Sequence, residues 1–159
     1  KPIRGNVETR IRKVTDGDYD AAVLAAAGII RLGLQDHVRQ YFTFDQILPA
    51  PGQGALAVQA RGDDERMLNL LKAIESSEVR RAVEAERYFL AGLGGGCSAP
   101  VGAHGEARAD SILLDGFVGS LDGTRIIRVR GKGRDPEEVG FRLAEEALGR
   151  GAKDLIPDE

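Results

Sequence analysis

The cysteine of the chain lies in a loop whose composition suits covalent chemistry. Cys97 follows the run Gly94–Gly96, and Pro100 comes three residues later. Glycine gives the backbone unusual dihedral angles and lets a ligand approach the main chain closely. An accessible thiolate in such a loop is a nucleophile. The alternative is a small apolar residue buried in a turn, because free cysteines are usually buried. Loop composition alone leaves both interpretations open.

Three arginines beside short predicted helices form a second candidate group. Arg4 lies two residues before Asn6, which is a good N-cap, so Arg4 is expected beside unpaired backbone N–H groups. A helix N-terminus with an adjacent arginine suits a carboxylate or a phosphate. Arg10 follows about one and a half turns later, and Arg31 follows an apolar stretch. The alternative is a solvated basic face, which is the usual role of a lone surface arginine.

The third candidate is a loop that separates two structural parts of the sequence. Gln53 and Gly54 belong to the run Pro51-Gly52-Gln53-Gly54, which breaks the hydrophobic pattern. Ligands favour clefts between domains, so such a loop can be a hinge and also border a binding site. A plain linker explains the same residues equally well.

The elements that must position these residues begin with an α/β pattern. A helix is predicted over 7–14, a buried strand over 20–25 and a short helix over 26–33. A strand over 55–60 and a helix from Asp63 or Asp64 to Ile74 follow. The first three elements are too small to bury both faces of a sheet, so we expect this part to need further chain.

The second half of the sequence predicts a small α+β domain. A helix over 78–93 precedes strands over 101–108, 112–119 and 125–130, with Asp122-Gly123 as the hairpin turn. The inward stripe of that helix is expected to comprise Val79, Val83, Glu86, Phe89 or Leu90, and Leu93.

A final helix is predicted from strong local signals. Asp135 as N-cap, Pro136 at the first helical position and acidic residues in the first turn mark its start, and Gly149 or Gly151 marks its end. Residues 76–159 should therefore form a three-stranded antiparallel sheet with its helices on one face.

Composition narrows the classes of function. The net charge is -3, so bulk electrostatics favour neither nucleic acid nor an anionic membrane as partner. No apolar run is long enough for a membrane span, and no signal peptide is apparent. One cysteine cannot form an internal disulfide, which favours a reducing cytoplasm. His37 and His104 share no metal-ligand spacing with Cys97, so we expect no metal. The start at Lys1, without Met, suggests a piece of a larger protein.

Four segments in order resemble the porphobilinogen deaminase family. They are RGNVETR (4–10), YDAAVLAAAGIIRLG (19–33), LPAPGQGA (48–55) and GGCSAPVG (95–102). Members of the family condense four porphobilinogen molecules into hydroxymethylbilane, with release of ammonia, in tetrapyrrole (heme) biosynthesis. The product grows on a dipyrromethane cofactor that a thioether holds to one cysteine, and Cys97 matches that cysteine.

The resemblance also implies binding roles for the other candidates. Arg4, Arg10 and Arg31 match family arginines that bind the acetate and propionate groups of cofactor and substrate, which a guanidinium can do bidentately. Gln53 and Gly54 match the interdomain loop beside the cleft.

The resemblance further implies a domain arrangement. The family has two domains that resemble periplasmic binding proteins and a third, three-stranded domain that carries the cysteine. Residues 1–50 would be the latter part of domain two, an α/β partial domain. Residues 51–75 would cross to domain one, and residues 76–159 would be domain three.

The family's catalytic aspartate lies upstream of everything present, so no catalytic residue is expected in this chain. We therefore expect the parent to be a transferase, monomeric and cytoplasmic, and the chain alone to be inactive. Its partners would be porphobilinogen, the growing oligopyrrole and the missing N-terminal half. Two alternatives stay open from the residues: a thiol-dependent enzyme that uses Cys97, and a non-catalytic anion-binding module that uses Arg4.

Overall fold

A computed structural model describes residues 1–94 and 99–156 of the chain. It divides the chain into two compact units, Lys1–Thr43 and Phe44–Glu159. Cys97 lies outside the described residues.

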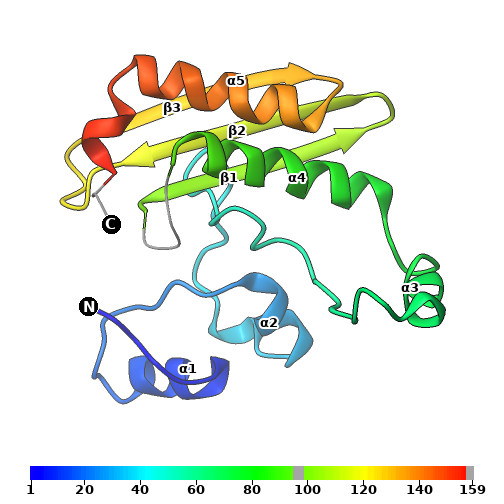
Figure 1. The fold of residues 1–159 in the computed structure, drawn as a ribbon. Helices are drawn as coiled ribbons and strands as arrows, with labels where there is room; N and C mark the ends of the chain where they lie inside the picture. The colour runs from blue at the N-terminus through cyan, green and yellow to red at the C-terminus, as the bar shows by residue number, and fades with distance from the viewer. Residues whose placement is uncertain (95–98, 157–159) are drawn as a thin grey trace. The chain divides into compact units, whose positions relative to one another are not determined.

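The first unit contains two short α-helices and one turn of 3-10 helix. Helix α1 spans Val7–Thr15, α2 spans Ala26–Arg31 and η1 spans Gln35–His37 (Figure 1). The predicted cap of α1 is confirmed, because Asn6 Oδ1 accepts the backbone N–H of Thr9 at 2.8 Å. The two helices of the motif segments thus form where the sequence predicts them.

The two strands predicted in the first half of the chain are wrong for this structure. Residues 20–25 and 55–60 have irregular backbone without sheet pairing. Leu56 is 98% exposed and Val58 is 61% exposed. A strand exists through hydrogen bonds to a neighbouring strand, and the described part of the chain offers these segments none. The predicted α/β layer is therefore not present here.

Helix α3, Glu65–Leu71, begins as predicted. Asp64 is its N-cap, and its side chain accepts from the N–H of Met67 at 3.0 Å. The helix ends three residues earlier than expected, since Ile74 lies beyond it.

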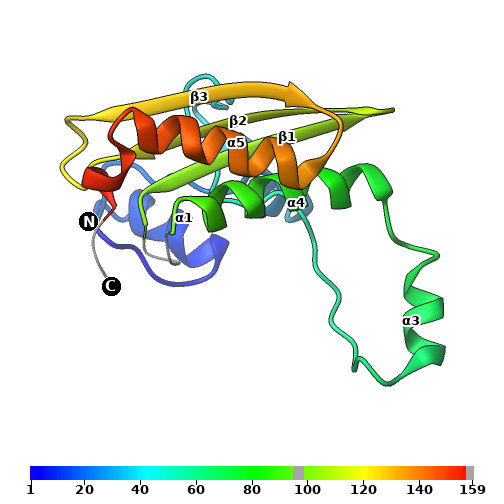
Figure 2. The ribbon, with the colours of Figure 1, turned by 45° about the horizontal axis from the view of Figure 1, so that its top comes forward.

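The second unit contains the predicted α+β domain. Helix α4 spans Ser77–Gly92, and strands β1 (Val101–Arg108), β2 (Ser111–Gly119) and β3 (Ile126–Gly133) follow. The strands pair antiparallel in the order β1-β2-β3. Helix α5, Pro136–Gly149, packs beside α4 on the same face of the sheet (Figure 1, Figure 2). The prediction of a three-stranded sheet with helices on one face is confirmed.

Local turn and cap chemistry explains the boundaries of this unit. Between β2 and β3, Asp122 Oδ1 accepts from the N–H of Thr124, and Gly123 has a φ of +71°. Glycine adopts that left-handed conformation without a steric penalty. At the start of α5, Asp135 Oδ1 accepts from the N–H of Glu138 at 2.9 Å. Gly151, at φ +90°, precedes the short helix η2, Ala152–Leu155. These signals lie where the sequence places them.

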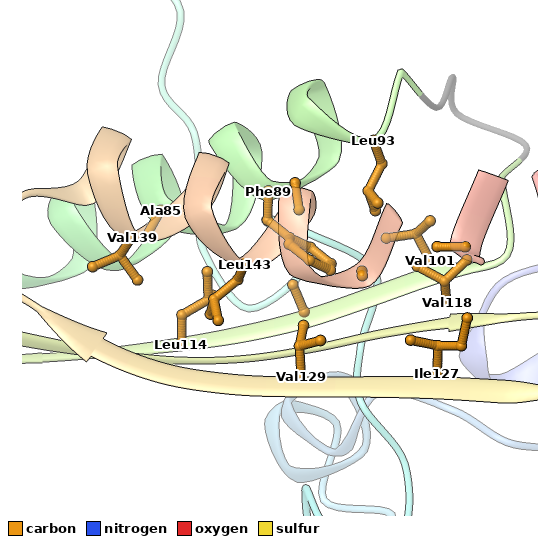
Figure 3. Close-up of a cluster of buried hydrophobic side chains, with 14 of the residues drawn as sticks. Ala85, Phe89, Leu93, Val101, Leu114, Val118, Ile127, Val129, Val139 and Leu143 are labelled. Atoms are coloured by element: carbon orange, nitrogen blue, oxygen red, sulfur yellow. The ribbon is translucent and has the colours of Figure 1, made fainter. Parts of the chain in front are cut away.

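The hydrophobic core lies between the sheet and its two helices (Figure 3). It joins α4, the inward residues of the strands and α5. Its largest fully buried side chains are Phe89, Ile112, Leu114, Leu143, Val118 and Val139. This layer holds both ends of the connection from α4 to β1, since Leu93 and Val101 are buried in it.

One position of the predicted inward stripe of α4 is wrong. Glu86, Phe89 and Leu93 are buried as expected and Val83 is half-buried, but Val79 is 49% exposed. Ala82 and Ala85 make the contact instead. A Cβ added at Gly105 on β1 would lie 2.7 Å from the carbonyl oxygen of Ala82. The helix therefore approaches the strand more closely than a valine-lined stripe permits.

Candidate cofactor and carboxylate site

The turn before α1 places two of the predicted arginines at one end of the helix. Gly5 has a φ of +124°, and a Cβ there would lie 2.7 Å from Thr9 Cγ2. Glycine is thus required between Arg4 and the Asn6 cap. Arg10 Nε donates to the carbonyl oxygen of Gly5 at 2.8 Å. The Arg10 side chain thus binds the backbone of the residue that follows Arg4.

The chemistry of this turn suits a carboxylate. Arg10 is half-buried and Arg4 is exposed. Among the described residues, the only hydrogen bond from the Arg10 side chain is the one from Nε, which leaves its terminal amino groups for a ligand. Lys13 Nζ donates to the carbonyl oxygen of Arg4 at 3.3 Å, which adds a third cation. Lys13 is not among the residues predicted from the sequence, because its proximity to Arg4 arises only once the chain folds back along α1.

Arg31 is the last residue of α2 and is exposed. A cation at a helix C-terminus also interacts favourably with the helix dipole, so its position has a structural explanation as well. Helices α1 and α2 lie close together, because a Cβ added at Gly28 would lie 3.3 Å from Val7 Cγ2. Within the described residues, the Arg31 side chain shares no hydrogen-bond partner with Arg4 or Arg10.

In the second unit, the predicted loop is closed by its own glutamine. Gln53 Oε1 accepts from the N–H of Ala50 at 3.1 Å, and the N–H of Gln53 donates to the carbonyl oxygen of Ala50 at 3.0 Å. Gly52 has a φ of +78°, and a Cβ added at Gly54 would meet nothing within 4 Å. Gln53 thus shapes the loop, while Gly54 leaves open space beside it.

The carboxylate of Glu86 holds this loop, a role that its place in the predicted inward stripe of the helix does not reveal. Glu86 Oε2 accepts from the N–H of Gly52 at 2.6 Å, and Oε1 accepts from the N–H of Gly105 at 2.7 Å. The residue is 6% exposed. Burial raises the pKa of Glu86 above its ordinary value, although the two backbone hydrogen bonds and nearby His104 oppose the shift. The available signal was an acidic residue within the buried stripe of a predicted helix.

The structure therefore groups the candidates by unit. Arg4 and Arg10 come together in the first, while Gln53, Gly54 and the connection that contains Cys97 belong to the second. Residues 1–94 and 99–156 contain no cluster of histidine, cysteine or acidic side chains that would hold a metal ion. None of their helices has the length and apolar content needed to cross a bilayer.

Comparison with known proteins decides the family. Residues 1–69 match the model of the porphobilinogen deaminase dipyromethane cofactor binding domain, and residues 80–149 match that of the porphobilinogen deaminase C-terminal domain. The chain belongs to the porphobilinogen deaminase family. The first match contains Arg4, Arg10, Arg31, Gln53 and Gly54, and the second contains Cys97.

Curated porphobilinogen deaminases align along almost the whole chain. The protein of Roseiflexus sp. (strain RS-1) is 47% identical over 156 residues, which are 97% of this chain and 51% of that protein. The protein of Deinococcus radiodurans is 44% identical over 158 residues, which are 98% of this chain and 51% of that protein. The chain thus spans about half the length of these porphobilinogen deaminases.

Proposed function

We propose that this chain is the C-terminal portion of a hydroxymethylbilane synthase. The parent condenses four porphobilinogen molecules into hydroxymethylbilane and releases ammonia. The observation that carries the proposal is identity of 42% to 47% to curated porphobilinogen deaminases along nearly the whole chain. The parent would work as a cytoplasmic monomer in tetrapyrrole biosynthesis.

Cys97 would hold the dipyrromethane cofactor through a thioether. When bound, that group supplies the pyrrole end on which the product is extended. Two features support this attachment point. The connection that contains Cys97 is glycine-rich, and both of its flanks, Leu93 and Val101, are buried in the core. An attachment point with anchored flanks keeps a growing chain at one place on the domain.

The arginines would bind the carboxylates of cofactor and product. Arg10 suits this task, because its Nε bond to Gly5 orients the guanidinium and leaves its outer edge available. Arg4 adds positive charge at the start of α1, and Lys13, in the last turn of the helix, adds more through its bond to the Arg4 carbonyl oxygen. Each pyrrole unit carries two carboxylates, so charge to be neutralised accumulates as the product grows. Arg31 would bind further carboxylates, and Gln53 and Gly54 would belong to the interdomain loop that the family resemblance implies.

The rest of the parent would complete the unpaired segments. Residues 1–50 would belong to a domain that resembles periplasmic binding proteins, residues 51–75 would cross to the other such domain, and residues 76–159 would form the third domain. Exposed Leu56 and Val58 support a missing sheet partner in the N-terminal half, since an apolar segment of this kind is otherwise an aggregation hazard.

Replacement of the cysteine in the full-length parent tests the proposal. Cys97→Ser should abolish the added mass of two pyrroles in the intact protein, because a hydroxyl is a much poorer nucleophile than a thiolate at neutral pH. Elongation with porphobilinogen should stop with it, while the circular dichroism spectrum stays unchanged. Ser98→Ala is the matched control and should keep the added mass. A Cys97→Ser protein that still carries two pyrroles would refute the assignment.

A further inference from the structure

The segment that enters the second unit is attached to the sheet along its length. We call residues 44–52 the strap. It begins on the face of the sheet opposite α4 and α5 (Figure 2) and passes the edge of β1 to reach α4. Three separate sets of contacts hold it, one at its start, one at its middle and one at its end.

A partly buried ion pair holds the start of the strap. Asp115 on β2 is 7% exposed, and its carboxylate binds Arg128 on β3 through Nε at 2.9 Å and Nη2 at 2.7 Å. The outer edge of the guanidinium then donates to two consecutive strap carbonyls, those of Phe44 at 2.9 Å and Asp45 at 2.8 Å. Because Asp115 fixes the guanidinium plane, Arg128 recognises the backbone of the strap in one orientation.

Packing and the free edge of β1 hold the middle of the strap. The ring of Phe44, at the start, stacks on His104 with 3.6 Å between ring centroids, and Leu48, in the middle, is 8% exposed. The N–H of Ala103, on the outer edge of β1, donates to the carbonyl oxygen of Pro49 at 2.9 Å. The strap therefore accepts a hydrogen bond from an edge-strand N–H that could otherwise pair with a strand of another chain.

Glu86 holds the end of the strap. Its two oxygens bind the N–H of Gly52, at the end of the strap, and the N–H of Gly105, on the same edge of β1. One carboxylate thus bridges α4, β1 and the strap. The loop of Gln53 and Gly54 begins at the next residue.

We propose that the strap is a rigid part of the C-terminal domain, and that Arg128 and Glu86 are positioning residues. They would fix the Gln53-Gly54 loop relative to the domain that carries Cys97. This inference rests on the proposed function and deepens it. As the oligopyrrole grows, the loop would stay in register with the attachment point, and flexing would occur before Phe44 and after Gly54.

Amide hydrogen exchange of the 159-residue chain tests the attachment without any activity. Arg128→Met should speed exchange in peptides covering the strap by about tenfold or more, while the amides shared by β2 and β3 keep their protection. Arg130→Met is the matched control, because Arg130 is an exposed arginine on the same strand. Equal strap exchange in Arg128→Met and wild type would overturn the proposal.

A second pair of variants covers the case in which unpaired Asp115 unfolds the sheet. Arg128→Met combined with Asp115→Leu removes both charges of the ion pair, and Phe44→Ala removes only the ring stacked on His104. Both should release the strap while the core stays protected. If both leave strap exchange unchanged, the strap is not held as proposed.

The full-length parent separates this inference from the proposed function. Arg128→Met should keep the two-pyrrole mass but change the distribution of elongation intermediates seen by mass spectrometry, and Arg128→Lys should partly restore it. A simple loss of stability would instead lower the amount of folded enzyme and leave that distribution unchanged, which counts against a positioning role. Absence of the two-pyrrole mass from the unaltered parent would refute the proposed function alone.

Discussion

At the scale of single residues, Glu86 shows how a buried carboxyl group gains its partners. It lies on the inward side of α4, where water is excluded, and two backbone N–H groups from other parts of the unit replace that water. Such hydrogen bonds favour the charged form, whereas burial opposes it and is the larger effect. The side chain therefore links the pH of the solution to the stability of the unit.

Glu86→Gln should reveal that link. Since the folded-state pKa of Glu86 is raised above 4.5, the folded protein binds this proton more tightly than the unfolded chain. The resulting stabilisation is complete below the ordinary pKa and is lost as the pH rises through the folded-state pKa. The free energy of unfolding of wild type minus that of Glu86→Gln should therefore fall from about pH 4 towards neutral pH.

Urea unfolding followed by circular dichroism across this pH range measures the difference. At neutral pH the substitution itself should lower the free energy of unfolding by about 1–3 kcal/mol, because the glutamine NH2 group faces one of the two backbone donors. Half-buried Glu84→Gln, two residues away on the same helix, is the control for removing a carboxyl group that does not bind the Gly52 and Gly105 amides. A difference that rises with pH would contradict the raised pKa.

At the scale of elements, the contact between α4 and α5 depends on the absence of a side chain. Gly140 lies inside α5, and a Cβ there would be 2.4 Å from Tyr88 Cβ and 2.8 Å from the carbonyl oxygen of Ala85. Glycine weakens a helix interior by about 1 kcal/mol relative to alanine. The close approach of the two helices outweighs that cost.

Gly140→Ala should therefore destabilise the protein by about 1–3 kcal/mol, because α5 must move away from α4. The matched control is Gly149→Ala in the same helix, where an added Cβ meets nothing within 4 Å. That change should be neutral or stabilising by up to about 1 kcal/mol. Thermal unfolding monitored by circular dichroism compares the two, and a Gly140→Ala protein as stable as wild type would argue against this close packing.

At the scale of the whole molecule, the chain combines a well-packed α+β domain with segments that bury little apolar surface. Leu56 and Val58 are exposed in one of the segments predicted as strands, and Val23, 68% exposed, lies in the other. The curated relatives are about twice as long as this chain. Under the proposed function, additional chain in the parent would supply a partner for both segments.

The isolated 159-residue chain should therefore form no hydroxymethylbilane from porphobilinogen. The resemblance places the family's catalytic aspartate upstream of this sequence, so under the proposed function the chain alone lacks the catalytic group. Chromatographic detection of the product, with the full-length parent as the positive control, checks this expectation. Product formed by the chain alone would mean that the catalytic group lies within these residues.

Sequence by itself determined the elements whose signals are local. The caps at Asn6, Asp64 and Asp135 and the turn at Asp122-Gly123 act through hydrogen bonds between residues two or three positions apart. The periodicity of residues 78–93 indicated a buried helix face, although Ala82 and Ala85 rather than Val79 are the buried residues of its first half. Such signals need no distant partner, so they can be read from a short stretch of chain.

Tertiary structure decided everything that depends on a distant partner. Residues 20–25 and 55–60 have the composition of strands but lack a neighbouring strand, so composition alone misassigned them. The carbonyls of Phe44 and Asp45 meet Arg128 more than eighty positions along the chain. Glu86 likewise joins Gly52 and Gly105 only because α4, the strap and β1 pack together. Strand pairing and the burial of charge are satisfied only by the assembled fold, because their partners come from parts of the chain far apart in sequence.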